Sequence, residues 1–108
     1  MSKGGLGDMM KQVQRMQEQM EQMQSELENM VIEATAGGGM VKVTVNGKND
    51  IKSITIDPEV VDKSDVEMLQ DLILAALRQA KEKAVEAQQE QMAGLTGGLN
   101  IPGLNLPF

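Results

Sequence analysis

Apolar residues in the first third of the chain recur in alternating steps of three and four. The series runs without a break through Leu6, Met9, Val13, Met16, Met20, Met23, Leu27 and Met30. This spacing corresponds to positions a and d of a heptad repeat. Many of the intervening residues are glutamines, which form helices well and suit exposed faces. The pattern predicts a long helix that begins near Leu6, with residues 1–5 as a loose segment before it.

The narrowness of this apolar seam leaves two interpretations open. The helix either lies on its own domain or also packs on a partner helix. A strict 3.5-residue period gives a narrower stripe than a helix buried on its own domain usually has, and it suits helix pairing. If the helix does pair between subunits, the candidate dimer-interface residues are Met16, Met20, Met23, Leu27 and Met30.

After Met30 the pattern changes to the alternation that is typical of strands. Segments 31–36, 40–45 and 51–56 are rich in Val, Ile and Thr and predict three strands. Gly37-Gly38-Gly39 lies between the first two. A glycine run can cradle phosphate, but no Gly-Lys-Ser/Thr follows here and no helix begins. We therefore expect a hairpin turn at this position.

The register of the second hairpin follows from which residues would face each other. A turn centred on Lys48-Asn49 places Val43 opposite Ile54, whereas a turn centred on Asn46-Gly47 places Val43 opposite Asp50. We favour the first register because a shift in side-chain parity would move apolar residues out of the core. It also pairs Val41 with Ile56 and Val45 with Lys52. The outer, polar face then carries Lys42, Thr44, Ser53 and Thr55.

A second long helix is predicted in the last third of the chain. Ser64 to Glu67 has the spacing of a capping box, in which the two end side chains each bind the other's backbone amide. The apolar stripe that follows is Leu-rich and then Ala-rich: Leu69, Leu72, Ile73, Ala76, Leu77, Ala80, Ala84 and Ala87. We expect its first half to be buried under the sheet and its second half to pack closely or to project into solvent. Gly94 is expected to end the helix.

The elements predict an α+β fold with a long N-terminal helix, a three-stranded antiparallel sheet and a long C-terminal helix. Residues 1–93 form one domain in this interpretation, and residues 94–108 form a Gly/Pro-punctuated apolar tail. The chain has 108 residues, ten Met and a single aromatic residue, Phe108. Such a core is thin, because aromatic side chains supply the largest buried areas. A thin core favours completion by oligomerisation.

Residue types that carry most enzyme chemistry are absent. The sequence has no His and no Cys, and its 16 acidic residues are scattered. A hydroxyl nucleophile would lack a His base, and transition metals usually bind His or Cys. We therefore expect neither an enzyme nor a metal or cofactor site. Without Cys, and without an apolar run long enough to span a membrane, the chain is expected in the cytoplasm.

The charge balance bears on nucleic acid. A net charge of −6 argues, taken alone, against a nucleic-acid partner. The basic residues, however, are grouped near the start of the first helix, on the hairpins and within the second helix. The plain interpretation is solubilising charge; the functional one is phosphate binding. The candidate DNA-binding residues are Lys3, Lys11, Arg15, Lys42, Lys48, Lys52, Arg78, Lys81 and Lys83.

Several short motifs occur in an order that resembles the YbaB/EbfC family of bacterial nucleoid-associated proteins. They are Gly5-Leu6-Gly7, Met9-Met10-Lys11-Gln12, the Met-Gln helix, Gly37-Gly38-Gly39, Val41-Lys42-Val43, Asn46-Gly47, Ile56-Asp57-Pro58, Glu67-Met68-Leu69, Asp71-Leu72, Leu95-Thr96-Gly97-Gly98-Leu99 and Pro107-Phe108. The resemblance implies a small α+β homodimer whose long helices project like tweezers. It also implies binding of duplex DNA with little sequence preference, on the nucleoid in the bacterial cytoplasm.

Two hypotheses about function therefore stand. The first is a DNA-binding homodimer in which local basic groups outweigh the acidic total. The second is an interaction or scaffold protein that acts through its Met-rich helix and apolar tail. Basic residues gathered on one face of the dimer would favour the first hypothesis, and negative potential on every face would favour the second.

Overall fold

The computed structural model describes the backbone of residues 2–99 and the side chains of residues 5–94. In chain order the elements are α1 (Ser2–Asn29), β1 (Ile32–Ala36), β2 (Val41–Val45), β3 (Ile51–Ile56), the short 3₁₀ helix η1 (Pro58–Val60) and α2 (Val66–Leu99). The expected α+β order of helix, three strands and helix is confirmed. Of the residues assigned to the tail, 100–108 lie outside this range.

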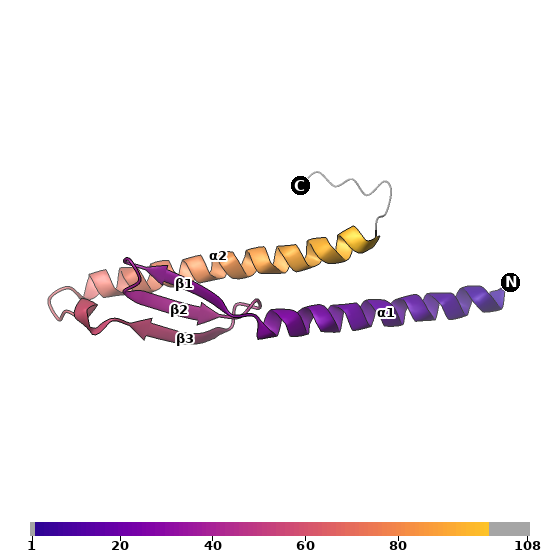
Figure 1. Cartoon of the computed structure of the whole chain (residues 1–108), viewed down its shortest axis with the longest axis horizontal. Helices are drawn as coiled ribbons and strands as arrows, with labels where there is room; N and C mark the ends of the chain where they lie inside the picture. Colours follow the sequence, from indigo (N-terminus) through magenta and orange to yellow (C-terminus); the bar gives the residue numbers. More distant parts are fainter. Residues whose placement is uncertain (1, 100–108) are drawn as a thin grey trace.

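The two long helices give the molecule its elongated shape (Figure 1). The first part of α2 lies along the sheet, and its second part projects beyond the sheet. α1 leaves the sheet at the same end, extends in the same direction as the projecting part of α2 and makes limited contact with that helix. The molecule measures 77 × 28 × 16 Å along its principal axes. Much of the surface of both helices is therefore exposed.

The sheet is antiparallel with strand order β1-β2-β3. Val43 pairs with Ile54, and Val41 pairs with Ile56, as the favoured register predicts. The β1–β2 turn is made by the three glycines 37–39, all with positive φ between 64° and 94°. Residues with side chains adopt this conformation only with strain, so the glycine run is explained by the hairpin turn.

The start of the second hairpin differs from the prediction. Val45 pairs with Ile51 rather than with Lys52, and Lys52 is the extra residue of a bulge. The loop has three residues, 47–49, because the amide of Asn46 donates to the carbonyl of Asp50. Asn49 has a φ of 68°, as expected for the left-handed residue that follows a turn in such loops. Because of this extra residue, Val43 still faces Ile54 although the loop has three residues instead of the expected two.

The core lies between the sheet and the middle of α2. It consists of Ala34, Val41, Val43, Val45, Ala76, Ala80 and Ala84. The most buried positions of α2 are thus alanines, whereas Leu69, Leu72, Ile73 and Leu77 are only partly buried. Small side chains let the helix approach the valines of β2 closely. The first half of α2 lies against the sheet and the Ala-rich half packs closely before the helix projects, as the sequence predicts, with the alanines as the most deeply buried residues (Figure 1).

Both long helices extend further than the sequence pattern predicts. α1 begins at Ser2 rather than near Leu6, and α2 continues past Gly94 to Leu99. A glycine costs about 1 kcal/mol within a helix. That cost is small once a helix has formed, because each further residue adds a hydrogen bond without new nucleation. Glycines at these positions therefore do not end the helices.

The capping box is also displaced by one residue. The carboxylate of Asp65, not the hydroxyl of Ser64, caps α2 by accepting a hydrogen bond from the amide of Met68 at 3.2 Å. The amide and hydroxyl of Ser64 instead donate to Asp62. These two bonds lower the pKa of Asp62 below its ordinary value because they stabilise the charged carboxylate. Before η1, Asp57 caps the turn through the amide of Glu59, as expected.

Candidate nucleic-acid interface

The basic residues of α1 lie on the part of the helix that projects from the sheet. Lys11 and Arg15 are exposed, and neither has a hydrogen-bond or ion-pair partner among residues 5–94. The side chain of Lys3 lies outside the described range. The first half of α1 therefore presents two free cations to solvent.

Three candidates are engaged within the chain. Lys42 forms an ion pair with the Glu33 carboxylate at 3.1 Å. Lys83 donates from Nζ to the Glu33 carbonyl oxygen at 2.8 Å. Lys48 lies 3.8 Å from the carboxylate of Glu28. Contacts of this kind reduce the positive charge that each group offers to a phosphate.

The remaining candidates are spread over the sheet and α2. Lys52, Arg78 and Lys81 are exposed and unpaired within the part of the chain whose side chains are described. Lys63, which the sequence argument omitted, is likewise exposed in the loop before α2. Its only signal in the sequence is its charge, because no other basic residue stands near it. The candidates therefore form separate groups on different elements rather than one patch.

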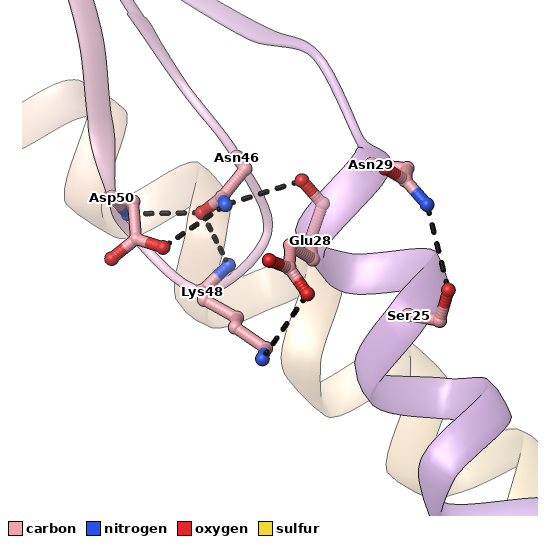
Figure 2. A network of polar contacts seen from close by, with 6 residues as sticks. All are labelled: Ser25, Glu28, Asn29, Asn46, Lys48 and Asp50. Atoms are coloured by element: carbon pink, nitrogen blue, oxygen red, sulfur yellow. Dashed lines mark hydrogen bonds and ion pairs between the residues drawn. The ribbon is translucent and has the colours of Figure 1, made fainter.

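A polar junction joins the root of α1 to the β2–β3 turn (Figure 2). Asn46 lies at its centre and is fully buried. Its Nδ2 donates to the carbonyl oxygen of Glu28 at 3.2 Å and to the carboxylate of Asp50 at 3.1 Å. Its Oδ1 accepts from the amides of Lys48 and Asp50, both at 2.9 Å. All four hydrogen-bonding positions of the amide side chain are thus occupied.

The same turn also contacts both projecting helices through Gly47. The Gly47 amide donates to the carbonyl oxygen of Leu27 at 2.7 Å. The Gly47 carbonyl accepts from Nε2 of Gln88, on α2, at 2.8 Å. We refer to residues 46–50, with these contacts, as the arm junction. It fastens α1 and α2 to one hairpin.

The apolar seam of α1 is mostly uncovered. Exposure falls from 67% at Leu6 to 51% at Met16 and 46% at Met20. Leu27 is buried within its own chain, against the arm junction. Met23 and Met30 are half-buried, and Met30 lines an open groove with Lys83 and Glu86. Of the candidate dimer-interface residues, Met16 and Met20 are the most available to a partner.

A second uncovered apolar surface lies on β3. α2 packs mainly on β1 and β2, so β3 extends beyond the helix. Ile54 pairs with Val43 on the core face of the sheet, yet it is 45% exposed, while Val43 is fully buried. Ile51, at the start of the same strand, is 56% exposed. We refer to Ile51, Ile54 and Ile56 as the β3 face.

The opposite edge of the sheet is covered by side chains of α2. Gln79 accepts a hydrogen bond from the amide of Thr35 at 3.0 Å, and Lys83 donates to the carbonyl of Glu33. These bonds satisfy backbone groups that an edge strand otherwise presents to other chains. For β3, no such side-chain bond occurs among residues 5–94.

Residues with described side chains include no group of three or more His, Cys, Asp or Glu placed to hold a metal ion. Likewise, no described helix is both long enough and apolar enough to cross a membrane.

The fold and these surfaces define a small α+β binding protein with two projecting helices and separate groups of exposed cations. The sequence matches the YbaB/EbfC DNA-binding family over residues 2–99, and the chain belongs to this family. The resemblance inferred from the short motifs is confirmed, as is the nucleoid-associated, DNA-binding class that it implies.

Full-length relatives agree with this assignment. The chain is 55% identical over 104 residues to a nucleoid-associated protein of Pelotomaculum thermopropionicum, covering 96% of this chain and 99% of that protein. It is 57% identical over 104 residues to a nucleoid-associated protein of Desulforamulus reducens, with the same coverage. An uncharacterised Helicobacter pylori protein of known crystal structure, HP0035, shares the fold with a TM-score of 0.65 at 22% identity. That match covers 77% of this chain and 96% of that one.

Proposed function

We propose that the protein is a homodimer that binds duplex DNA on the bacterial nucleoid, in the cytoplasm, with little sequence preference. The observation that carries the proposal is the placement of Lys11 and Arg15 on a projecting helix, free of intrachain partners, in a member of a DNA-binding family. Within residues 2–17, Asp8 alone opposes the basic residues, so this part of α1 carries a local positive charge despite the acidic total. A local positive charge attracts phosphate.

The homodimer is supported by apolar surface that the single chain leaves uncovered. The core contains only Val and Ala at its most buried positions. The β3 face continues this core beyond the cover of α2, and β3 has the sheet edge that α2 side chains do not block. A second copy supplies apolar surface of the same kind. We propose that the β3 face is buried between subunits, and that Met16, Met20 and Met23 extend the contact along α1.

DNA contact in this proposal comes from the projecting part of α1 and from the part of α2 that covers the sheet. Lys11 and Arg15 on α1, and Arg78 and Lys81 on α2, are exposed and unpaired among the described side chains. Lys3 and Lys52 are further candidates. Lys42, Lys48 and Lys83 contribute less because each has an acidic or carbonyl partner in its own chain. Dimerisation doubles the number of basic groups, so that groups from both subunits contact one duplex together.

Weak sequence preference follows from the kind of contacts available. Lysine contacts to phosphate position a protein without identifying bases. Only Arg15 and Arg78 can make the bidentate contacts to guanine that arginine favours. They lie on different helices, so no single helix carries a cluster of base-reading side chains.

A scaffold function is the second candidate. The observation in its favour is the long exposed seam of α1, together with a net charge of −6. In this alternative the seam binds another protein and DNA contact is incidental.

Binding to two unrelated duplexes over a range of salt concentrations tests the proposal. For a dimer that neutralises about four phosphates, log affinity falls against log salt with a slope of roughly −3.6. We expect this slope on both sequences, with similar affinities. If neither duplex binds even at low salt, the DNA proposal is wrong and the scaffold alternative is favoured.

A further inference from the structure

α1 is held to the rest of the chain almost entirely at its root. Every described side chain from Gly5 to Gln22 is exposed, and burial begins with Met23 and Leu27. At a rise of 1.5 Å per residue, Lys11 lies about 24 Å along the helix from Leu27. A rotation of about 15° at the root therefore displaces Lys11 by about 6 Å. Within one chain, the direction of α1 therefore depends on what holds its last turn.

The arm junction holds that turn through the helix carbonyls. The last carbonyls of a helix have no partner within the helix and must find one elsewhere. Here the Leu27 carbonyl accepts from the amide of Gly47, and the Glu28 carbonyl accepts from Asn46 Nδ2. Both of these donors come from the β2–β3 turn, while the amide of Met30, which follows α1, makes a longer bond of 3.3 Å to the same Leu27 carbonyl. The helix end is therefore capped in large part by a different part of the fold.

The junction resists rotation because its central side chain is buried and fully bonded. Asn46 binds Glu28 with one end of its amide and the turn backbone with the other. On the far side of the turn, Gln88 ties α2 to the Gly47 carbonyl. A change in the angle between α1 and α2 must break at least one of these bonds, and breaking those of Asn46 leaves a buried polar group unsatisfied.

We infer that the arm junction sets the angle between α1 and α2, and that Asn46 is a positioning residue for DNA binding. The inference rests on the proposed function, in which cations on both helices contact one duplex. Asn46 itself is buried and touches no DNA. It acts by keeping Lys11 and Arg15 at a fixed distance from Arg78 and Lys81.

Distance measurements between spin labels test the inference directly. The chain has no Cys, so Gln14→Cys and Gln89→Cys introduce one label on each helix at exposed positions. Labelled chains are mixed with an excess of unlabelled chains, so that the intrachain distance dominates. We expect a narrow distribution in the parent protein and a broad one after Asn46→Ala. In the unlabelled variant we expect DNA affinity to fall about tenfold and the salt slope to decrease in magnitude by about 1, as for one lost phosphate contact.

Two further variants separate positioning from loss of stability. Gln88→Ala removes only the hydrogen bond between α2 and the Gly47 carbonyl. Since alanine is a good helix former, the variant is expected to fold. We expect it to broaden the distribution of label distances less than Asn46→Ala does. Asn29→Ala is the matched control, since the Asn29 side chain bonds only to Ser25 within α1. It is expected to change neither distance nor affinity. All measurements are made at a temperature where circular dichroism shows each variant folded.

The outcomes are distinguishable. A distribution that stays narrow in both Asn46→Ala and Gln88→Ala overturns the inference. A broad distribution with unchanged DNA affinity also overturns it, because the angle then has no bearing on binding. If the parent protein binds no duplex at all, the proposed function fails, and the link between Asn46 and DNA fails with it.

Discussion

The backbone amide of Gly47 lies 2.7 Å from the carbonyl oxygen of Leu27 and donates a hydrogen bond to it. This contact joins the β2–β3 turn to the last turn of α1. It requires a residue without a side chain, because a Cβ on Gly47 would lie 2.9 Å from the Leu27 oxygen and 2.7 Å from Leu27 Cδ2. Glycine is needed here for close approach between two elements.

Gly47→Ala is expected to destabilise the protein. The new methyl group must displace backbone atoms of α1, which cannot move as freely as the end of a side chain. Overpacking of this kind typically costs about 1–3 kcal/mol. Urea unfolding followed by circular dichroism measures the change in the free energy of unfolding.

Gly94→Ala is the control for this prediction. A Cβ on Gly94 meets no atom within 4 Å, and the residue lies within α2. Alanine is favoured over glycine in a helix by about 1 kcal/mol. We expect Gly94→Ala to be neutral or stabilising. If both alanine substitutions have the same effect, the close approach at Gly47 is not the cause.

Val43→Asp is expected to unfold the protein. Val43 is fully buried in the centre of the sheet. A buried carboxylate without a partner costs at least about 3 kcal/mol, a large part of the stability of a small domain. Thr55→Asp is the matched control, since Thr55 is exposed and pairs across the strands with Lys42. Near-native melting of the Thr55 variant and no cooperative transition for the Val43 variant are the expected results.

The register of the sheet was predictable because it depends on side-chain parity. Only one register places Val43 opposite Ile54, and the structure has that pairing. The bulge at Lys52 was not predictable from parity, since it arises from a three-residue loop closed by the amide and side chain of Asn46. Local turn chemistry decided where the extra residue is placed.

The sequence identifies the basic candidate residues but not the partners that they have in the fold. Sequence identifies Lys42, Lys48 and Lys83 as basic. It does not show that Glu33 lies near two of them, because that contact depends on how β1 and α2 pack. The arm junction was missed for a similar reason. In the sequence, Asn46-Gly47 indicates a turn and is one of the family motifs, but neither pattern predicts its long-range contacts with α1.

Ile54→Lys is expected to dissociate the proposed dimer and to leave the chain folded. Ile54 is 45% exposed within one chain, so a lysine stem fits there with its charge in solvent. If the subunit interface buries the β3 face, dimerisation removes two lysine charges, one from each subunit, from water. That desolvation cost disfavours the dimer. Sedimentation equilibrium of the parent and the variant measures the change in mass.

Concentration-dependent melting gives a second test of the same interface. The parent melting temperature should rise with protein concentration, as it does when subunits stabilise each other, and that of Ile54→Lys should not. Thr55→Lys, on the outer face of the same strand, is the control and should remain dimeric. A folded parent monomer at micromolar concentration contradicts the homodimer. If Ile54→Lys and Thr55→Lys dissociate the dimer equally, the interface does not lie on the β3 face.

Removing the free cations of α1 or of α2 is expected to weaken DNA binding, and to do so alike on unrelated sequences. The double variants are Lys11→Ala with Arg15→Ala, and Arg78→Ala with Lys81→Ala. All four side chains are exposed, so folding should be retained. Loss of two phosphate contacts should reduce the magnitude of the salt slope by about 1.8.

Lys63→Glu is the control. It changes the net charge by the same amount as either double variant, but Lys63 lies in the loop before α2. If Lys63→Glu weakens binding as much as the double variants do, net charge rather than the basic residues of α1 and α2 governs DNA affinity. If neither double variant changes affinity or slope, DNA contact does not occur through α1 and α2, and the exposed apolar seam of α1 becomes the surface to test for a protein partner.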